Sequence, residues 1–449
     1  MKTTLHLSAA ALLASAAPFV AQAQFNYTTN DSTVIITGYT GSGGDVEVPN
    51  TIDGLPVTSI GDEAFAYCTT LTNVTIPNSV TNIGSYGFQS CINLGRVTIP
   101  EGVTTIPEGA FSKCTRLTSV IIPDTVERIL NSLHVYERGG GWGSGAFESC
   151  TSLTNLSMGL GVTEIGAGSF ANCANLANVT IGRNVTIIGE GAFCGSGLQY
   201  LAIPPSVSSI GAGAFCNCTS LTSINIPNSV TNIDSYGRGY STALGWRPSP
   251  VGEFAYCTSL TNVTIGSGLV GIPAMTFVGC SSLTSVTVAE GVLGIGYWAF
   301  AYCTHLRSII LPSSLAYAEY AFIGCDSVTG AYFRGNAPSC TTLGFEAGPN
   351  VYYLPGTIGW DTFPYPTAPW VLPYPVILTS SPSFGVQTNS FGFTVSWATN
   401  VPVVVEASTS LNNPAWIPVA TNTLINGTSY FSDHDQVNHP SRFYRVRAQ

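Results

Sequence analysis

The chain has 449 residues, of which only 8% are charged, and its formal net charge is −10. Lysine and arginine together number 14 and form no basic cluster, which excludes a surface that follows a run of nucleic-acid phosphates. No stretch beyond the N-terminal region reaches about 18 uninterrupted apolar residues, so the sequence gives no support for a membrane-spanning helix.

The N-terminal segment predicts export. Lys2 precedes an apolar run from Leu5 to Val20, and Ala21-Gln22-Ala23 follows it. A basic start, an apolar middle and a small-residue end are the parts of a secretory signal peptide. We expect residues 1–23 to be cleaved, residues 24–48 to form an N-terminal cap, and the mature protein to be secreted or displayed on the cell surface.

A phenylalanine recurs at a nearly constant interval through residues 49–335. Eight of the ten intervals are 22 or 23 residues long, and the other two are 36 and 39 residues. This period predicts a solenoid, in which stacked repeats bury a core that no single repeat could hide. The eleven positions are Phe65, Phe88, Phe111, Phe147, Phe170, Phe193, Phe215, Phe254, Phe277, Phe300 and Phe322.

Each repeat contains a short half-buried strand. In residues 71–91, Val74 and Ile76 alternate with Asn73 and Thr75, which is the period of two that such a strand requires. The consensus L-x-x-V-x-I-P-x-x-V-x-x-I-G-x-x-A-F-x-x-C resembles the BspA-like branch of the bacterial leucine-rich repeats over about residues 45–335. The resemblance implies short parallel strands on one face of a β-rich solenoid. It also implies a surface or secreted protein that binds host or matrix proteins or mediates attachment.

Ten of the thirteen cysteines stand three residues after the repeated phenylalanine. Stacking places them in one interior column, where we expect buried free thiols; a column of reactive or metal-binding thiolates would need nearby cations, and arginines are too few. Cys194 and Cys216 stand outside the column, at equivalent positions of adjacent repeats. Because neighbouring strands lie about 4.8 Å apart, a disulfide between these two is within reach, and the sequence leaves it open.

The outward positions of the strands are short and mostly uncharged, and Arg96 and Tyr200 are their most distinctive members. One interpretation is that Thr and Asn only keep the sheet soluble. The other is a hydrogen-bonding face for a peptide strand, a glycan or an extracellular protein. The sequence does not decide between the two.

The two long intervals contain extra residues at the same point of the repeat, after Ile129 and after Ile233. Tyr, Trp and Arg dominate binding hot spots, so both loops are candidate binding elements. Alternatively, their rings pack back onto the solenoid and only fix a tolerated insertion. The candidate residues are Tyr136, Arg138 and Trp142 in the first loop, and Arg238, Tyr240, Trp246 and Arg247 in the second.

The C-terminal part has a different pattern. Residues 336–377 are expected to form a C-terminal cap and a Pro-rich linker, and residues 378–449 a small antiparallel β-sandwich as an accessory domain. Asp433-His434-Asp435 is the most suggestive group for a metal or a hydrolase site, but a solvated turn explains it as well. We expect no catalytic residue, no metal and no cofactor.

The sequence therefore predicts a secreted or surface-exposed binding or adhesion protein without catalysis. Its partner would be an extracellular protein or polysaccharide. Two alternatives remain: a structural surface-layer or spacer protein with no specific ligand, and a hydrolase that uses Asp433, His434 and Asp435.

Overall fold

The computed structural model describes residues 24–130, 145–233, 252–346, 348–370, 372–379, 381–387, 390–412, 414–439 and 441–449. These residues divide into two compact units. The first unit comprises the described residues of Met1–Leu221 and Asp234–Cys257, and the second comprises Thr222–Ile233 and those of Thr258–Gln449.

In its described part, the regular elements of the first unit are all β-strands, which turns connect. They are β1 (Phe25–Thr29), β2 (Val34–Tyr39), β3 (Gly44–Glu47), β4 (Thr51–Ile52), β5 (Leu55–Ile60), β6 (Leu71–Thr75), β7 (Asn82–Ile83), β8 (Arg96–Thr98), β9 (Thr105–Ile106), β10 (Ser119–Ile121), β11 (Arg128–Ile129), β12 (Asn155–Ser157), β13 (Glu164–Ile165), β14 (Asn178–Thr180), β15 (Ile187–Ile188), β16 (Tyr200–Ala202) and β17 (Ser209–Ile210).

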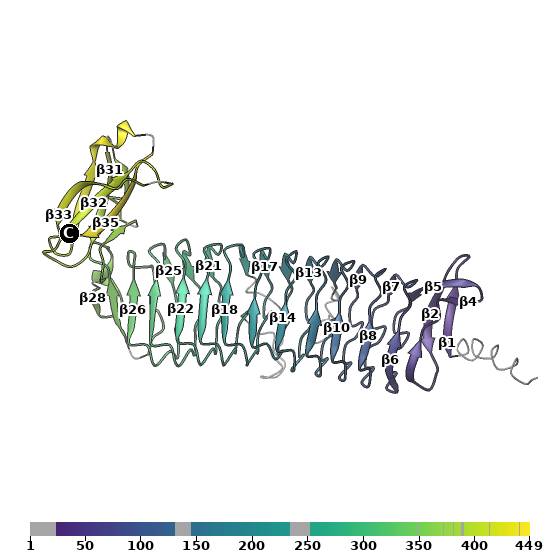
Figure 1. Cartoon of the computed structure of the whole chain (residues 1–449). Helices are drawn as coiled ribbons and strands as arrows, with labels where there is room; N and C mark the ends of the chain where they lie inside the picture. The colour runs from purple at the N-terminus through teal and green to yellow at the C-terminus, as the bar shows by residue number, and fades with distance from the viewer. Residues whose placement is uncertain are drawn as a thin grey trace, which may run out of the picture. The chain divides into compact units, whose positions relative to one another are not determined.

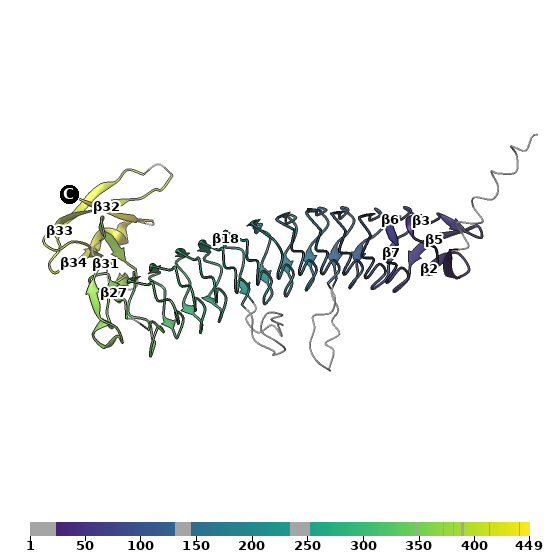
Figure 2. The same cartoon turned by 90° about the horizontal axis from the view of Figure 1, so that it is seen from below.

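Each repeat of the first unit supplies one strand to each of two parallel sheets. The longer strands β3, β6, β8, β10 and β12 form one sheet, and β14 pairs with β16 in the same parallel way. The two-residue strands β9, β11, β13, β15 and β17, which we call return strands, form the other. Figure 2 shows β3 and β6 on one side of the coil and β7 on the other. The antiparallel hairpin β1–β2 lies in the segment expected as the N-terminal cap.

Most turns after the return strands contain two residues in the left-handed conformation, which makes the turn compact. The residue two positions after the repeated phenylalanine has φ of 57° at Ser90, 61° at Lys113 and 58° at Asn172. The residue two positions before it has φ of 61° at Gly109 and 63° at Gly168. Glycine adopts this region without steric cost, whereas other residues are strained there.

The phenylalanines stack along the interior. Phe88 and Phe111 have ring centroids 5.3 Å apart with planes 4° from parallel, and Phe147 and Phe170 are 5.4 Å apart with planes at 1°. The spacing follows the strand separation of about 4.8 Å. All eleven repeated phenylalanines are fully buried. Each contributes about 1.5–3 kcal/mol through removal of its side chain from water.

The second unit begins with strands that continue the same repeat and ends in a separate β domain. Its elements are β18 (Ser223–Ile226), β19 (Asn232–Ile233), β20 (Asn262–Ile265), β21 (Gly271–Ile272), β22 (Ser285–Val288), β23 (Gly294–Ile295), β24 (Ser308–Leu311), β25 (Tyr317–Ala318), β26 (Gly330–Phe333), β27 (Asn350–Tyr353), the 3-10 helix η1 (Trp360–Thr362), β28 (Thr367–Pro369), β29 (Val376–Leu378), β30 (Gly385–Gln387), β31 (Ser390–Ser396), β32 (Pro402–Ser408), β33 (Ile417–Thr423), β34 (Thr428–Asp433), the 3-10 helix η2 (His434–Asn438) and β35 (Phe443–Ala448).

The solenoid part of the second unit extends beyond the last repeat that the sequence pattern marks. A parallel sheet runs in the order β18-β20-β22-β24-β26-β27-β28, and the return strands β21, β23 and β25 form a second one (Figure 1). Phe345 stacks on Phe322 with ring centroids 5.0 Å apart, although no Ala-Phe motif marks this turn. Residues 336–377, expected to form a cap and a linker, thus contain β27 and β28 of this sheet.

The C-terminal residues form two antiparallel sheets, as predicted. The first contains β30, β31, β29 and β34, with β31 central, and the second runs in the order β33-β32-β35. The strands β31, β32 and β35 lie within residues 378–449, where a small antiparallel β-sandwich was expected. The buried residues Phe393, Val395, Val403, Val405, Leu424 and Phe431 form their common core.

Candidate functional site

The strand face of the second unit is the outward side of β18, β20, β22 and β24. Alternation along each strand buries one apolar residue in the middle, and leaves the residues on either side of it pointing away from the core. Seven of the eight outward side chains are hydroxyls or amides, and none is charged. The eight exposed residues are Ser223, Asn225, Asn262, Thr264, Ser285, Thr287, Ser308 and Ile310.

A hollow of about 290 Å³ lies on this face between β22 and β24. The ladder there has one registered pair, Thr287 opposite Ile310, whereas β20–β22 and β24–β26 have four pairs each. The hollow therefore lies where the two strands pair least. Its lining consists of Thr284, Ser285, Val286, Thr287, Val288, Ser308, Ile310, Leu311, Pro312 and Arg334.

The lining combines three kinds of group that can hold a polar ligand. The hydroxyls of Ser285 and Ser308 can both donate and accept hydrogen bonds. The guanidinium of Arg334 only donates, and Arg334 makes no ion pair within the described residues. Ile310, with 42% of its surface exposed, adds an apolar contact. This set fits the carbonyl or hydroxyl groups of a ligand and contains no pair of a nucleophile and a base.

Arg96 and Tyr200 do not come together in the structure. Arg96 begins β8 and Tyr200 begins β16, both with exposed side chains, and the strands β10, β12 and β14 belong to the repeats between them. Four strand intervals correspond to about 19 Å. Their role in binding stays a prediction, and it would have to be two separate contacts.

The candidate residues of the two long loops lie outside the described residues. This applies to Tyr136, Arg138, Trp142, Arg238, Tyr240, Trp246 and Arg247. Their part in binding therefore stays a prediction.

The cysteine column is buried, as predicted, with the half-buried Cys68 as the exception. Eight of the buried column thiols donate to the carbonyl of the phenylalanine one repeat earlier, for example Cys114 Sγ to Phe88 O at 3.2 Å. Burial raises the pKa of the Cys114 thiol to about 12, so it stays protonated and unreactive near neutral pH. The sulfurs act as packing groups that also satisfy backbone carbonyls.

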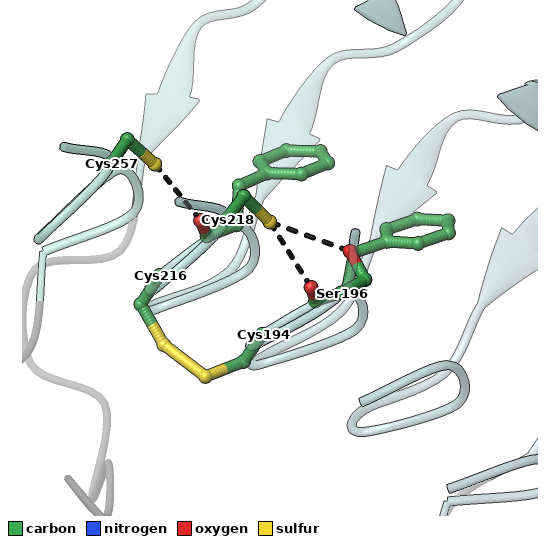
Figure 3. The surroundings of a disulfide bond; sticks show 7 residues. Cys194, Ser196, Cys216, Cys218 and Cys257 are labelled. Carbon is green, nitrogen blue, oxygen red and sulfur yellow. Dashed lines mark hydrogen bonds between the residues drawn. A yellow bond between two sulfur atoms is a disulfide. The ribbon is translucent and has the colours of Figure 1, made fainter. Parts of the chain in front are cut away.

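A disulfide joins Cys194 and Cys216, whose Cα atoms are 4.6 Å apart (Figure 3). Beside it, Ser196 takes the place of the column cysteine in its repeat. Its hydroxyl lies 3.4 Å from Cys218 Sγ, and Cys218 also donates to Phe193 O. The bridge connects two adjacent turns on the outside of the thiol column and leaves the column itself reduced.

The Asp433-His434-Asp435 group is held by structural contacts. Asp433 is buried, accepts hydrogen bonds from Asp435 N and Tyr444 Oη at 2.9 Å, and forms an ion pair with Arg442 at 2.8 Å. Hydrogen bonds from Asn438, and then from Arg442 and His439, hold the pKa of Asp435 well below its usual range. Both carboxylates are thus engaged in fixing η2 and its neighbouring strand. The group is a turn, as one interpretation expected, but Asp433 in it is buried and not solvated.

The described residues contain neither a metal-binding cluster nor a membrane-spanning helix. Among them, no group of three or more His, Cys, Asp or Glu side chains is arranged to hold a metal ion. None of their helices has the length and apolar character to cross a membrane.

Sequence reasoning missed Arg334. It follows β26, in a turn whose leucine is replaced by Val328, and the repeat pattern gave it no outward column. The signal that could have identified it is the parallel register of β24 and β26, which pairs Leu311 with Phe333 and so places Arg334 opposite Pro312, one residue beyond the end of both strands.

Comparison with known proteins identifies the family of the repeat. A family model described as BspA type leucine rich repeat region matches residues 45–135, 142–239 and 250–349 with six copies, which confirms the resemblance drawn from the motif. No curated protein matches the chain.

The solved structures of similar sequence include two bacterial leucine-rich repeat proteins. A leucine-rich repeat protein of Bacteroides ovatus is 26% identical, with a TM-score of 0.43, over 73% of this chain and 92% of its own. A leucine-rich cell surface protein of Faecalibacterium prausnitzii is 27% identical, with a TM-score of 0.38, over 70% of this chain and 94% of its own.

Proposed function

Because the chain belongs to the family of BspA-type leucine-rich repeat proteins, we propose that it is an exported binding or adhesion protein. It attaches to an extracellular protein or polysaccharide through the strand face of its second unit. Export follows from the predicted signal peptide of residues 1–23, and the product is secreted or displayed on the cell surface.

The hollow between β22 and β24 is the observation that carries the proposal. It combines exposed hydroxyls, one exposed isoleucine and Arg334, which makes no ion pair in the described part of the chain. Arginine donors and apolar anchors are the groups that dominate binding energy at protein surfaces. A ligand that presents acceptor groups to Arg334, hydrogen-bonding groups to the serine hydroxyls and an apolar group to Ile310 would use all three.

The proposal includes no catalytic step. The carboxylates of Asp433 and Asp435 are held by Arg442 and by neighbouring donors, which leaves neither as a free general base. The buried thiols have raised pKa values and are poor nucleophiles.

The test begins with the protein lacking residues 1–23 on arrays of matrix proteins and glycans. Ser308→Trp would fill the hollow and Arg334→Ala would remove its donors; we expect each to weaken retention of the identified ligand by about tenfold or more. Thr98→Trp, at an exposed position of β8 in the first unit, is the matched control and should bind normally. Unchanged binding by both second-unit variants would refute the site.

The alternative of a structural spacer makes the opposite prediction. A spacer would retain no ligand on either array and would self-associate in dilute solution without one. Sedimentation velocity of the ligand-free protein distinguishes the two, because a monomer that binds a ligand supports the binding protein.

A further inference from the structure

Four aromatic side chains of the second unit form an exposed surface away from the strand face. We call Tyr297, Trp298, Tyr317 and Tyr320 the aromatic surface. Their exposed fractions are 57%, 42%, 50% and 39%. They belong to the return strand β25 and to the turns that follow β23 and β25, on the other sheet from the hollow.

Tyr317 lies flat on a floor of two glycines. The return strands pair Gly271 with Gly294 and Gly294 with Tyr317, so the three residues form one outward column. A Cβ atom on Gly294 would overlap the Tyr317 ring, and one on Gly271 would lie 3.2 Å from the Tyr317 hydroxyl. The ring therefore crosses two turns against bare backbone, and the half of its surface that is exposed lies away from that floor.

Trp298 and Tyr320 occupy equivalent positions in the turns that follow β23 and β25. Both stand two residues before the repeated phenylalanine and have φ of 59° and 50°. Glu63, Tyr86 and Met275 hold this position in other turns with the same left-handed conformation, so the conformation belongs to the repeat. What distinguishes Trp298 and Tyr320 is a large aromatic side chain that is exposed at 42% and 39%.

Tyr297 adds a second aromatic element. Its ring stacks on that of Tyr320, with centroids 5.8 Å apart and planes 16° from parallel. Both tyrosines keep more than a third of their surface exposed, and their hydroxyls supply hydrogen-bonding groups in the turns that follow β23 and β25. The surface thus offers an aromatic platform together with polar edges.

The charge around the aromatic surface selects against anions. The sequence contains no lysine or arginine between Arg247 and Arg307, nor between Arg307 and Arg334. Glu319, between Tyr317 and Tyr320, accepts hydrogen bonds from the backbone and hydroxyl of Thr341, which lower its pKa and keep it negative. A sulfated, phosphorylated or uronic-acid ligand would meet the carboxylate of Glu319, and residues 294–298 and 317–322, which carry the aromatic surface, contain no lysine or arginine.

A second copy of the chain is a poor occupant for this surface. The exposed parts of the four rings amount to about 400 Å², judged from the 150–250 Å² that one aromatic side chain can bury. A stable protein interface needs about 800 Å² on each partner. A sugar ring needs much less, because its C–H face covers a single aromatic ring.

We propose that the aromatic surface binds a neutral glycan, with one sugar ring stacked on Tyr317 and its hydroxyls hydrogen-bonded by Tyr297 and Tyr320. The inference rests on the proposed binding role of the protein, but it does not depend on what occupies the strand face. It adds a second site with a stated ligand class.

The test uses affinity electrophoresis of the protein lacking residues 1–23 in gels that contain soluble mannan, xylan or β-glucan, with heparin and polygalacturonate as charged probes. We expect retardation by at least one neutral polysaccharide and none by the polyanions. Calorimetry with hexasaccharides of the retarding polysaccharide then gives affinities. Tyr317→Ala should weaken binding about tenfold or more, whereas Tyr317→Phe keeps the platform and should retain most of the affinity.

Gly294→Ala provides the sharpest variant, because it leaves every aromatic residue in place and only lifts the Tyr317 ring from its floor. It should weaken binding in the same direction as Tyr317→Ala. Gly95→Ala is its matched control, since a Cβ there lies 3.8 Å from the nearest atom, and Tyr67→Ala controls for loss of an exposed tyrosine. Circular dichroism verifies that each variant keeps the fold. Ser308→Trp, which changes the hollow and not the aromatic surface, should bind the same glycan normally.

Three results would overturn the proposal: no retardation by any neutral polysaccharide, stronger retardation by heparin or polygalacturonate, or wild-type affinity in both Tyr317→Ala and Gly294→Ala. Retention of a matrix protein without any glycan would overturn this inference and leave the proposed function standing. Retention of nothing on either array would contradict both.

Discussion

In the first unit, the outward column of the return strands holds Asn82, Thr105, Arg128, Glu164, Ile187 and Ser209, whereas in the second unit the aligned strands β21, β23 and β25 hold Gly271, Gly294 and Tyr317. The backbone pairing is parallel in both columns. In the first column Arg128 and Glu164 pair across adjacent turns at 2.7 Å, and in the second a single ring covers two glycines. One scaffold thus carries two different surfaces, because the interior alone fixes the fold.

The two units share the same kind of interior, with buried phenylalanines and thiols. We expect alkaline pH to lower the stability of this interior, because the thiols are buried in their protonated form. Burial raises the pKa of Cys114, Cys173 and Cys218 from 9.0 to about 12. Since the folded-state pKa is the higher one, this contribution is complete below pH 9 and is lost as the pH rises toward 12. Each thiol then lowers the free energy of unfolding by about 1.4 kcal/mol per pH unit.

Urea denaturation at pH 8, 9 and 10 measures this loss, and Cys114→Ala combined with Cys173→Ala should make the pH dependence shallower. The variant pair removes two titrating groups but keeps the phenylalanine stack, so its stability at pH 8 serves as the reference. An unchanged pH dependence in the double variant would show that the thiols are not the cause.

The phenylalanine stack should be equally important in both units. Phe170→Ala in the first unit and Phe300→Ala in the second each delete a fully buried ring between two stacked neighbours. We expect each to lower the free energy of unfolding by about 3–5 kcal/mol, as measured by urea denaturation. A loss in one unit that is several kcal/mol smaller than in the other would break the comparison, because it would mean that the interiors differ as well.

The sequence predicted the interior well because every interior column repeats. Phe147 and Cys150 take the same places as Phe170 and Cys173, so the pattern could be read without knowing the path of the chain. Strands that lack the motif, such as β27 and β28, were not predicted as part of the sheet, because their interior residues differ from the consensus.

The candidate surfaces could be predicted only in part, because they depend on register between turns. Gly271 and Gly294 look like ordinary members of a glycine-rich repeat, and only their alignment with Tyr317 makes them a floor. Arg334 reaches the hollow from a turn that departs from the consensus. The general outward face was predictable from the alternation of buried and exposed residues, but the particular residues that distinguish one turn from another were not.

The smallest expected effect concerns the outward column of the first unit. Arg128→Ala removes the ion pair with Glu164. The side chain of Arg128 is 52% exposed and that of Glu164 is 25% exposed. Exposed ion pairs contribute about 0.2–1 kcal/mol and are screened by salt, so the loss of unfolding free energy should lie in that range at low ionic strength and vanish in about 1 M NaCl.

Tyr317→Ala, in the corresponding column of the second unit, should leave that salt dependence unchanged while it weakens glycan binding. Urea denaturation of both variants at two salt concentrations makes the comparison. A loss above about 2 kcal/mol for Arg128→Ala would mean that the first column stabilises the fold, and that the two surfaces differ in their importance for folding as well as in composition.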